Sequence, residues 1–381
     1  MEQTNRLLSL DVLRGITVAG MILVNDPGSW GAVYAPLCHA SWNGLTPTDL
    51  VFPFFMFIMG VSMFFSLRKY NYRFSGEAAT KIFKRAAIIF LIGLGINWFA
   101  LFFASLCDTG SGLPLGERLV AGLLSFDRLR ILGVLQRLAL AYFGGALLCL
   151  WVKPRYHLAT AVFILLGYFV ILLVGHGFEI SERNVIGVVD RTLFGEGHIY
   201  RQGLPGGSVM AFDPEGLLSA IPGIAHVLFG MFIGRMLIEV KDNESRVRQL
   251  FIFGTVLLFA GCLLSYGCPI NKKVWSPTYV LVTCGLASQL LALLMYVIDV
   301  KGNKKWCGFF EAFGVNPLFI YLLSDVLAIV LGYTIQDDIY TVLLASWMNP
   351  YLASLVYALL FVLLNWVVAD RLYKRKIYIK I

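Results

Sequence analysis

Long apolar segments recur along the whole chain, and a chain of this kind folds stably only inside a lipid bilayer. Of the 381 residues, 58% are hydrophobic and 14% are charged, whereas soluble domains carry about a quarter charged residues. About 20 apolar residues suffice for one transmembrane helix. We expect ten such helices, at residues 7–25, 50–67, 86–104, 131–151, 157–175, 217–238, 250–266, 277–298, 308–332 and 350–368.

This spacing predicts an all-α, polytopic integral membrane helix bundle that forms a single transmembrane domain over residues 1–381. The ninth helix is expected to break at Asn316-Pro317, since proline interrupts the helical hydrogen-bond ladder. No cleavable signal peptide is expected, because the first apolar segment contains Asp11 and Arg14 and has no small-residue cleavage site.

The basic residues predict the orientation of the bundle. With a cytoplasmic N-terminus, 22 of the 31 Lys and Arg residues fall in or beside cytoplasmic loops and eight fall outside. This bias predicts that both termini are cytoplasmic and that the loop around His39 is extracytoplasmic. Because topology explains the net charge of +8, no nucleic-acid partner is expected. The seven scattered Cys lack metal-ligand spacing, so we expect no metal.

The stretch "LCHASWNGLTPTDLVFPFFMFIMG" places polar side chains directly before an apolar segment. His39 can accept a proton near neutral pH, and Asp49 can orient it or cap the second helix. Asn25, at the same end of the first span, can hold a sugar hydroxyl or a developing oxyanion. Trp42 offers a stacking face for a sugar ring. An interfacial aromatic belt with an incidental His explains the pattern equally well.

Polar residues inside the spans form a second group of candidates, because burying them in lipid is costly. Asp11 and Arg14 share one helix face at a spacing of three, which allows an ion pair or a contact from Arg14 to a phosphorylated ligand. Gln136 and Arg137 lie early in the fourth span, where the guanidinium suits a phosphate or carboxylate. Asn316 lies within the ninth.

One extracytoplasmic loop, residues 176–216, is long and contains "GLPGGSVMAFDPEG". Its Gly, Pro and acidic residues suit an ordered cap or a substrate-facing loop, and a simple connector is an equal alternative. Asp213 and Glu215 are its candidates for substrate contact.

Several stretches resemble the heparan-alpha-glucosaminide N-acetyltransferase family. They include "LSLDVLRGITVAGMILVN", "CHASWNGLTPTDLVFPFFMFIMG", "RILGVLQRLALAY", "FDPEGLLSAIPGIAHVLFGMFIG", "WSPTYVLVTCGLASQLLAL" and "GVNPLFIYLLS". The resemblance implies acetyl transfer from cytoplasmic acetyl-CoA to the amine of a terminal glucosamine across the membrane. It places the catalytic histidine at His39, the active-site asparagine at Asn25, and implies a homodimer.

Because the N-terminal luminal region and preceding span of lysosomal members are missing, we expect a bacterial-type member in the cytoplasmic membrane, acting on glucosamine or a related amino sugar. His39 acts as general base or acetyl carrier, with Asp49 beside it. The donor-binding candidates are Arg14, Gln136, Arg137 and Asn316. The acceptor-binding candidates are Trp42, Asn43, Asp213 and Glu215.

Two other functions fit the same residues. An amino-sugar transporter would also place polar groups inside its helices, although no internal repeat is apparent. A membrane O-acyltransferase of polysaccharides also opens its first span with a D-x-L-R-G pattern. Acetyl transfer by the purified protein separates an enzyme from a transporter, and an amine-only acceptor profile argues against O-acylation.

Overall fold

The structure is a computed structural model that describes residues 7–203 and 207–379, and it confirms the all-α membrane helix bundle. Within these residues, nine helices are long and apolar enough to cross a membrane, or ten when the bent pair α11–α12 counts as one span. Arg6 and Lys380, counted above as cytoplasmic charges, and residues 204–206 of the long loop lie outside the described ranges.

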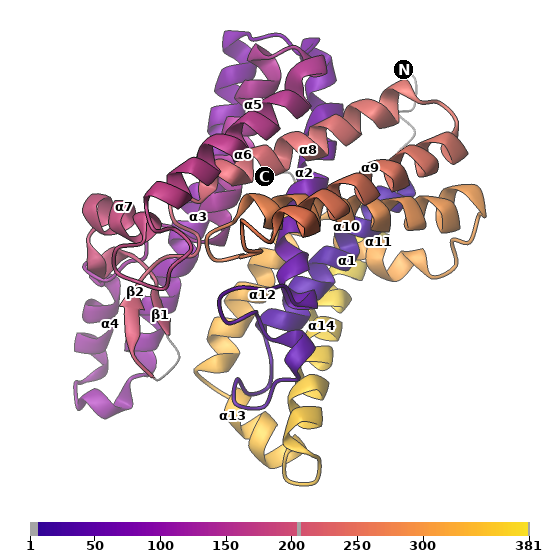
Figure 1. Ribbon diagram of the computed structural model, residues 1–381. Helices are drawn as coiled ribbons and strands as arrows, with labels where there is room; N and C mark the ends of the chain where they lie inside the picture. Colours follow the sequence, from indigo (N-terminus) through magenta and orange to yellow (C-terminus); the bar gives the residue numbers. More distant parts are fainter. Residues whose placement is uncertain (1–6, 204–206, 380–381) are drawn as a thin grey trace.

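Figure 1 shows the arrangement of the elements. The spanning helices are α1 (Leu8–Asn25), α2 (Val51–Leu67), α3 (Gly76–Cys107), α5 (Val134–Trp151), α6 (His157–Val174), α8 (Ala220–Glu239), α9 (Asn243–Leu264), α10 (Pro277–Met295), α11 (Cys307–Val315) with α12 (Pro317–Gly332), and α14 (Pro350–Lys374). The connecting elements are α4 (Leu115–Leu123), α7 (Val185–Phe194), α13 (Gln336–Asp338) and the strands β1 (Arg201–Gly203) and β2 (Val209–Ala211).

The predicted spans match these helices, but α3 and α9 begin ten and seven residues before their predicted starts at 86 and 250. α3 has 32 residues and begins ten residues before the predicted start, because the hydroxyl of Ser75 accepts a hydrogen bond from the Ala78 N–H and caps its polar first turns. The break at Asn316-Pro317 is confirmed, and α11 and α12 meet there at 85°.

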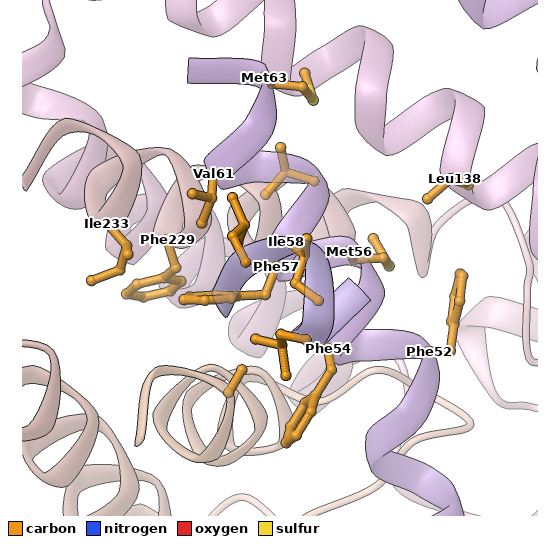
Figure 2. Packing of buried hydrophobic residues seen from close by; sticks show 14 of the residues in the cluster. Phe52, Phe54, Met56, Phe57, Ile58, Val61, Met63, Leu138, Phe229 and Ile233 are labelled. Carbon is orange, nitrogen blue, oxygen red and sulfur yellow. The ribbon is translucent and has the colours of Figure 1, made fainter. Parts of the chain in front are cut away.

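The core of the bundle lies where α2 packs along α8. Figure 2 shows Phe57 and Val61 of α2 beside Phe229 and Ile233 of α8, and all four side chains are fully buried. Gly60 and Gly230 allow this close approach, since a Cβ at either position would come within 2.2 Å of a carbonyl oxygen of the other helix. Small residues serve this purpose at many membrane helix contacts.

The described residues of the long loop between α6 and α8 form defined secondary structure. It contains α7 and an antiparallel hairpin in which Gln202 pairs with Met210, and Figure 1 shows both on the same flank as α4. Met210 and Phe212 are buried with Trp42 in a small second core. The loop therefore packs against the segment that carries His39.

Candidate active site

His39 and Asp49 form a hydrogen-bonded pair just before α2. The distance from His39 Nδ1 to Asp49 Oδ1 is 2.6 Å. Asp49 belongs to a short 3₁₀ helix, Pro47–Leu50, and its other oxygen accepts from the backbone N–H groups of Ala40 and Thr46, each at 3.1 Å. The carboxylate thus caps the helix start and contacts the imidazole, so one residue fulfils both roles considered above.

The pairing determines which imidazole nitrogen is available for chemistry. An ionised carboxylate can only accept, so Nδ1 of His39 is the donor in this contact, and in a neutral imidazole Nε2 is then the acceptor. The Asp49 side chain is 1% exposed, whereas that of His39 is 46% exposed. A buried carboxylate thus orients an accessible proton acceptor. Lys272 Nζ lies 3.1 Å from Nδ1, 3.5 Å from Nε2 and 3.5 Å from Asp49 Oδ1.

A small cavity of about 100 Å³ opens beside this pair, and we call it the His39 cavity. Two other predicted residues, Asn25 and Glu215, line it together with Lys272 and Tyr321. The remaining lining residues are Met21, Val24, Thr48, Val51, Phe52 and Val134. The cavity therefore combines a base, an amide and a carboxylate with apolar walls, which suits a ligand that is partly polar.

An ion-pair network fixes the acidic end of the long loop. Arg130 donates to Asp213 through Nε at 2.9 Å and Nη2 at 2.6 Å, and to Glu215 at 2.7 Å. Asp213 is fully buried and also accepts from the backbone N–H of Tyr200. Burial acts to raise the pKa of Glu215, but Arg130 and Arg137 outweigh it and hold the pKa below its usual value. Glu215 therefore lines the His39 cavity as an anion, whereas Asp213 is committed to the network.

Asp190 of α7 is a second buried carboxylate beneath this loop. One oxygen accepts from the Leu217 N–H at 3.0 Å, and within the described part of the chain the other has no hydrogen-bond partner. Burial, together with the nearby Asp213, raises the pKa of Asp190 to about 7. The folded protein therefore retains a proton that the unfolded chain releases near pH 4.

This difference predicts how stability depends on pH. Because the pKa of Asp190 is higher in the folded state, its contribution is most favourable below about pH 4 and declines as pH rises toward 7. Asp190→Asn should remove this dependence and raise the melting temperature at pH 8 by roughly 5 °C, measured by thermal unfolding in detergent. The control is Asp127→Asn, which removes a 77% exposed carboxylate. Parallel curves for wild type and Asp190→Asn would contradict the prediction.

Arg137 and Gln136 are both buried, but at the loop side of the bundle. Arg137 donates to the carbonyl of Pro214 and the hydroxyl of Ser219, and its guanidinium lies 4.6 Å from the centre of the Trp275 ring. These contacts hold the segment that carries Glu215. Neither Gln136 nor Arg137 lines the cavity around Arg14 described below.

Trp42 and Asn43 form hydrogen bonds that connect the His39 loop to two other loops. The Trp42 indole N–H donates to the carbonyl of Phe178 at 2.9 Å, and its ring packs 5.5 Å from that of Phe212. Trp42 is only 7% exposed, so its ring faces the protein and not an open surface. Asn43 accepts a hydrogen bond from the side chain of Asn271 at 3.0 Å. Both residues thus contact the loop segments around the His39 cavity.

A larger cavity of about 430 Å³, which we call the Arg14 cavity, lies toward the other end of the bundle. Arg14 donates to Asp11 at 2.8 Å, which confirms the predicted ion pair, and to the hydroxyl of Ser62 at 2.7 Å. Arg85 of α3 and Ser66 of α2 also line the cavity. Two guanidinium groups and hydroxyls therefore face an otherwise apolar space.

Asn316 holds the C-terminal segment beside the Arg14 cavity. Its amide donates to the carbonyl of Ile377 and accepts from the N–H of Ile379, both at 2.8 Å. Ile379 lines the cavity, whereas Asn316 does not. The amide thus positions part of the cavity wall.

A narrow apolar space, which we call the neck, lies between the two cavities and shares lining residues with each of them. Its volume is about 10 Å³. It shares Phe55, Leu138 and Leu318 with the Arg14 cavity. It shares Met21, Phe52, Val134 and Tyr321 with the His39 cavity. Along α2, Val51 at one end and Ser66 at the other are about 22 Å apart at 1.5 Å per residue. The three spaces therefore run through most of the bundle.

Lys272 and Tyr321 are among the lining residues of the His39 cavity that were not predicted as site residues. Lys272 was counted only as an external positive charge, and Tyr321 was treated as part of an apolar span. The sequence contains one signal for the first, the pair Lys272-Lys273 in a loop on the side where basic residues are few.

Comparison with known proteins identifies the family. The family model described as "Heparan-alpha-glucosaminide N-acetyltransferase, catalytic" matches residues 6–267. The mouse heparan-alpha-glucosaminide N-acetyltransferase is 29% identical over 100% of this chain and 61% of its own length. The human protein of the same name is 30% identical over 84% of this chain and 53% of its own length. This chain thus matches about half to three fifths of each relative. It belongs to the heparan-alpha-glucosaminide N-acetyltransferase catalytic family.

Proposed function

We propose that the protein is a membrane-embedded acetyltransferase that moves acetyl from cytoplasmic acetyl-CoA to the amine of glucosamine or a related amino sugar on the extracytoplasmic side. The observation that carries the proposal is the path from the Arg14 cavity through the neck to His39. The names of the relatives agree with this chemistry, and the bias of basic residues places Arg14 on the cytoplasmic side.

The donor binds with its phosphates at the Arg14 end. Arg14 and Arg85 supply positive charge there, and guanidinium groups suit phosphate oxygens. The thin arm that carries the thioester follows the apolar neck toward the His39 cavity, and the side chains that line the neck move apart to admit it. The bulky, charged nucleotide stays on the cytoplasmic side, so only the acetyl end of the donor has to reach the far side.

The reaction takes place in the His39 cavity. The acceptor nitrogen attacks the thioester carbonyl carbon, and its proton passes to Nε2 of His39. Asn25 stabilises the oxyanion, and Glu215 accepts a hydrogen bond from the acceptor. When the carbon–sulfur bond breaks, the thiolate leaves with a proton returned by the imidazolium. Asp49 holds the ring in position throughout.

The test is acetyl transfer by detergent-purified protein with acetyl-labelled acetyl-CoA and glucosamine. Formation of labelled N-acetylglucosamine, with no transfer to glucose as the matched acceptor without an amine, supports the proposal. Absence of transfer to a panel of amino sugars, with uptake of labelled glucosamine into proteoliposomes, would favour a transporter instead. A separate assay with labelled acetyl-CoA and no acceptor distinguishes His39 as a general base from His39 as an acetyl carrier. Only an acetyl carrier becomes labelled at His39.

Donor binding can be tested at Arg85. Its side chain is exposed and lines the Arg14 cavity, so Arg85→Gln removes charge with little effect on packing. Losing one charge-assisted hydrogen bond to phosphate should raise the KM for acetyl-CoA about tenfold and leave kcat within about twofold. The matched control is Lys84→Gln, because Lys84 is the adjacent exposed cation and does not line the cavity. Equal KM values for the two variants would place the donor phosphates elsewhere.

A further inference from the structure

Lys272 Nζ lies within 3.5 Å of both ring nitrogens of His39, and its loop is held in place by several contacts. The carbonyl of Ile270 accepts from the Gly44 N–H at 2.8 Å, and the amide of Asn271 donates to Asn43 at 3.0 Å. Asn271 is fully buried. The loop from α9 to α10 is therefore joined to the His39 loop by the two residues directly before the lysine.

The charges around His39 come from several elements. Asp49 lies in the 3₁₀ helix before α2, Glu215 in the loop before α8, and Arg137 in α5 faces the same region. Lys272 contacts the imidazole and Asp49 directly. Burial holds the pKa of Lys272 below its usual value, and Asp49 and Glu215 limit this lowering because they favour the charged ammonium.

The balance between Asp49 and Lys272 affects the protonation of His39. A carboxylate alone, 2.6 Å from the ring, strongly favours the imidazolium, which cannot accept another proton. An ammonium at 3.1–3.5 Å from the ring disfavours the imidazolium. With both present, the carboxylate can orient the ring without leaving it protonated before the acceptor arrives.

We infer that Lys272 is a positioning residue that offsets the charge of Asp49 and keeps His39 in the neutral form that accepts the acceptor's proton. The role of Lys272 in the reaction rests on the proposed function. Its effect on the protonation of His39 does not depend on that function. The protonation of His39 can be measured without donor or acceptor, so a failure of the inference is distinguishable from a failure of the proposed function.

The experiment measures the carbethoxylation rate of His39 by diethyl pyrocarbonate from pH 5 to 8, with peptide mass spectrometry to separate His39 from the other four histidines. The reagent attacks only neutral imidazole, so the midpoint reports protonation. Lys272→Met should move the midpoint upward by about one pH unit or more. Lys272→Arg should restore the wild-type value. In a protein active in acetyl transfer, the acid limb of the pH–rate profile should shift in the same direction.

The neighbouring Lys273 provides the matched control. Its Nζ lies 6.0 Å from the centre of the Trp42 ring, and it does not line the His39 cavity, so Lys273→Met should shift the midpoint much less than Lys272→Met. A wild-type midpoint in Lys272→Met, or an equal shift in Lys273→Met, would overturn the inference. If the methionine variant does not elute as a folded protein, Lys272→Gln replaces it in the same measurement with the same expected shift.

Discussion

Replacing His39 by Gln should lower kcat for acetyl transfer at least a hundredfold, because the variant cannot accept the acceptor's proton. Gln is polar, as His is, and can still contact Asp49. The carboxylate is therefore not left without the hydrogen-bond partner that His39 provides at 2.6 Å. The loss should therefore appear in kcat with little change in the melting temperature. Steady-state kinetics with labelled acetyl-CoA and the preferred amino sugar measures it.

The chain provides a matched control for this variant at His176. His176 also contacts a carboxylate, with Nδ1 at 3.0 Å from Glu179, but both side chains are exposed and neither lines the His39 cavity. His176→Gln should keep wild-type activity. If the two variants retain equal activity, the general base lies elsewhere.

Adding one methyl group at Gly230 should destabilise the bundle by about 3 kcal/mol or more. A Cβ there would lie 2.2 Å from the carbonyl oxygen of Phe57 and 3.1 Å from the Cα of Gly60. Both atoms belong to the backbone, so no side chain can rotate away, and α2 and α8 must separate. Gly230→Ala should melt roughly 5 °C or more below wild type in detergent.

Gly167→Ala is the control for that substitution. Gly167 lies within α6, and a Cβ there would meet nothing within 4 Å, so alanine should be neutral or slightly stabilising through its higher helix propensity. If the alanine variants of Gly230 and Gly167 melt at the same temperature, the contact between α2 and α8 is not the determinant of stability that the geometry indicates.

The spans could be predicted from the sequence because membrane insertion depends on local properties. A window of about 20 residues contains the hydropathy signal, and the break at Asn316-Pro317 follows from the chemistry of proline alone. The Asp11–Arg14 ion pair could also be predicted from local sequence, because its members are three residues apart on one helix.

The rest of the site depends on contacts between distant segments. Lys272 and His39 are 233 residues apart in the chain, and one sequence does not indicate that their loops meet. Arg137 illustrates the same limit. Its burial in a span was predicted, but its partners at Pro214 and Ser219 lie on a loop whose path the sequence does not reveal.

The neck has a consequence for the membrane as a whole. At about 10 Å³ it has room for about one water molecule, and its walls are mostly apolar. An apolar constriction of this size is a barrier to ion flow. Under the proposed function, the protein therefore gives the acetyl group a route across the bilayer without discharging the electrical potential, and a cell can carry many copies without losing its ion gradients.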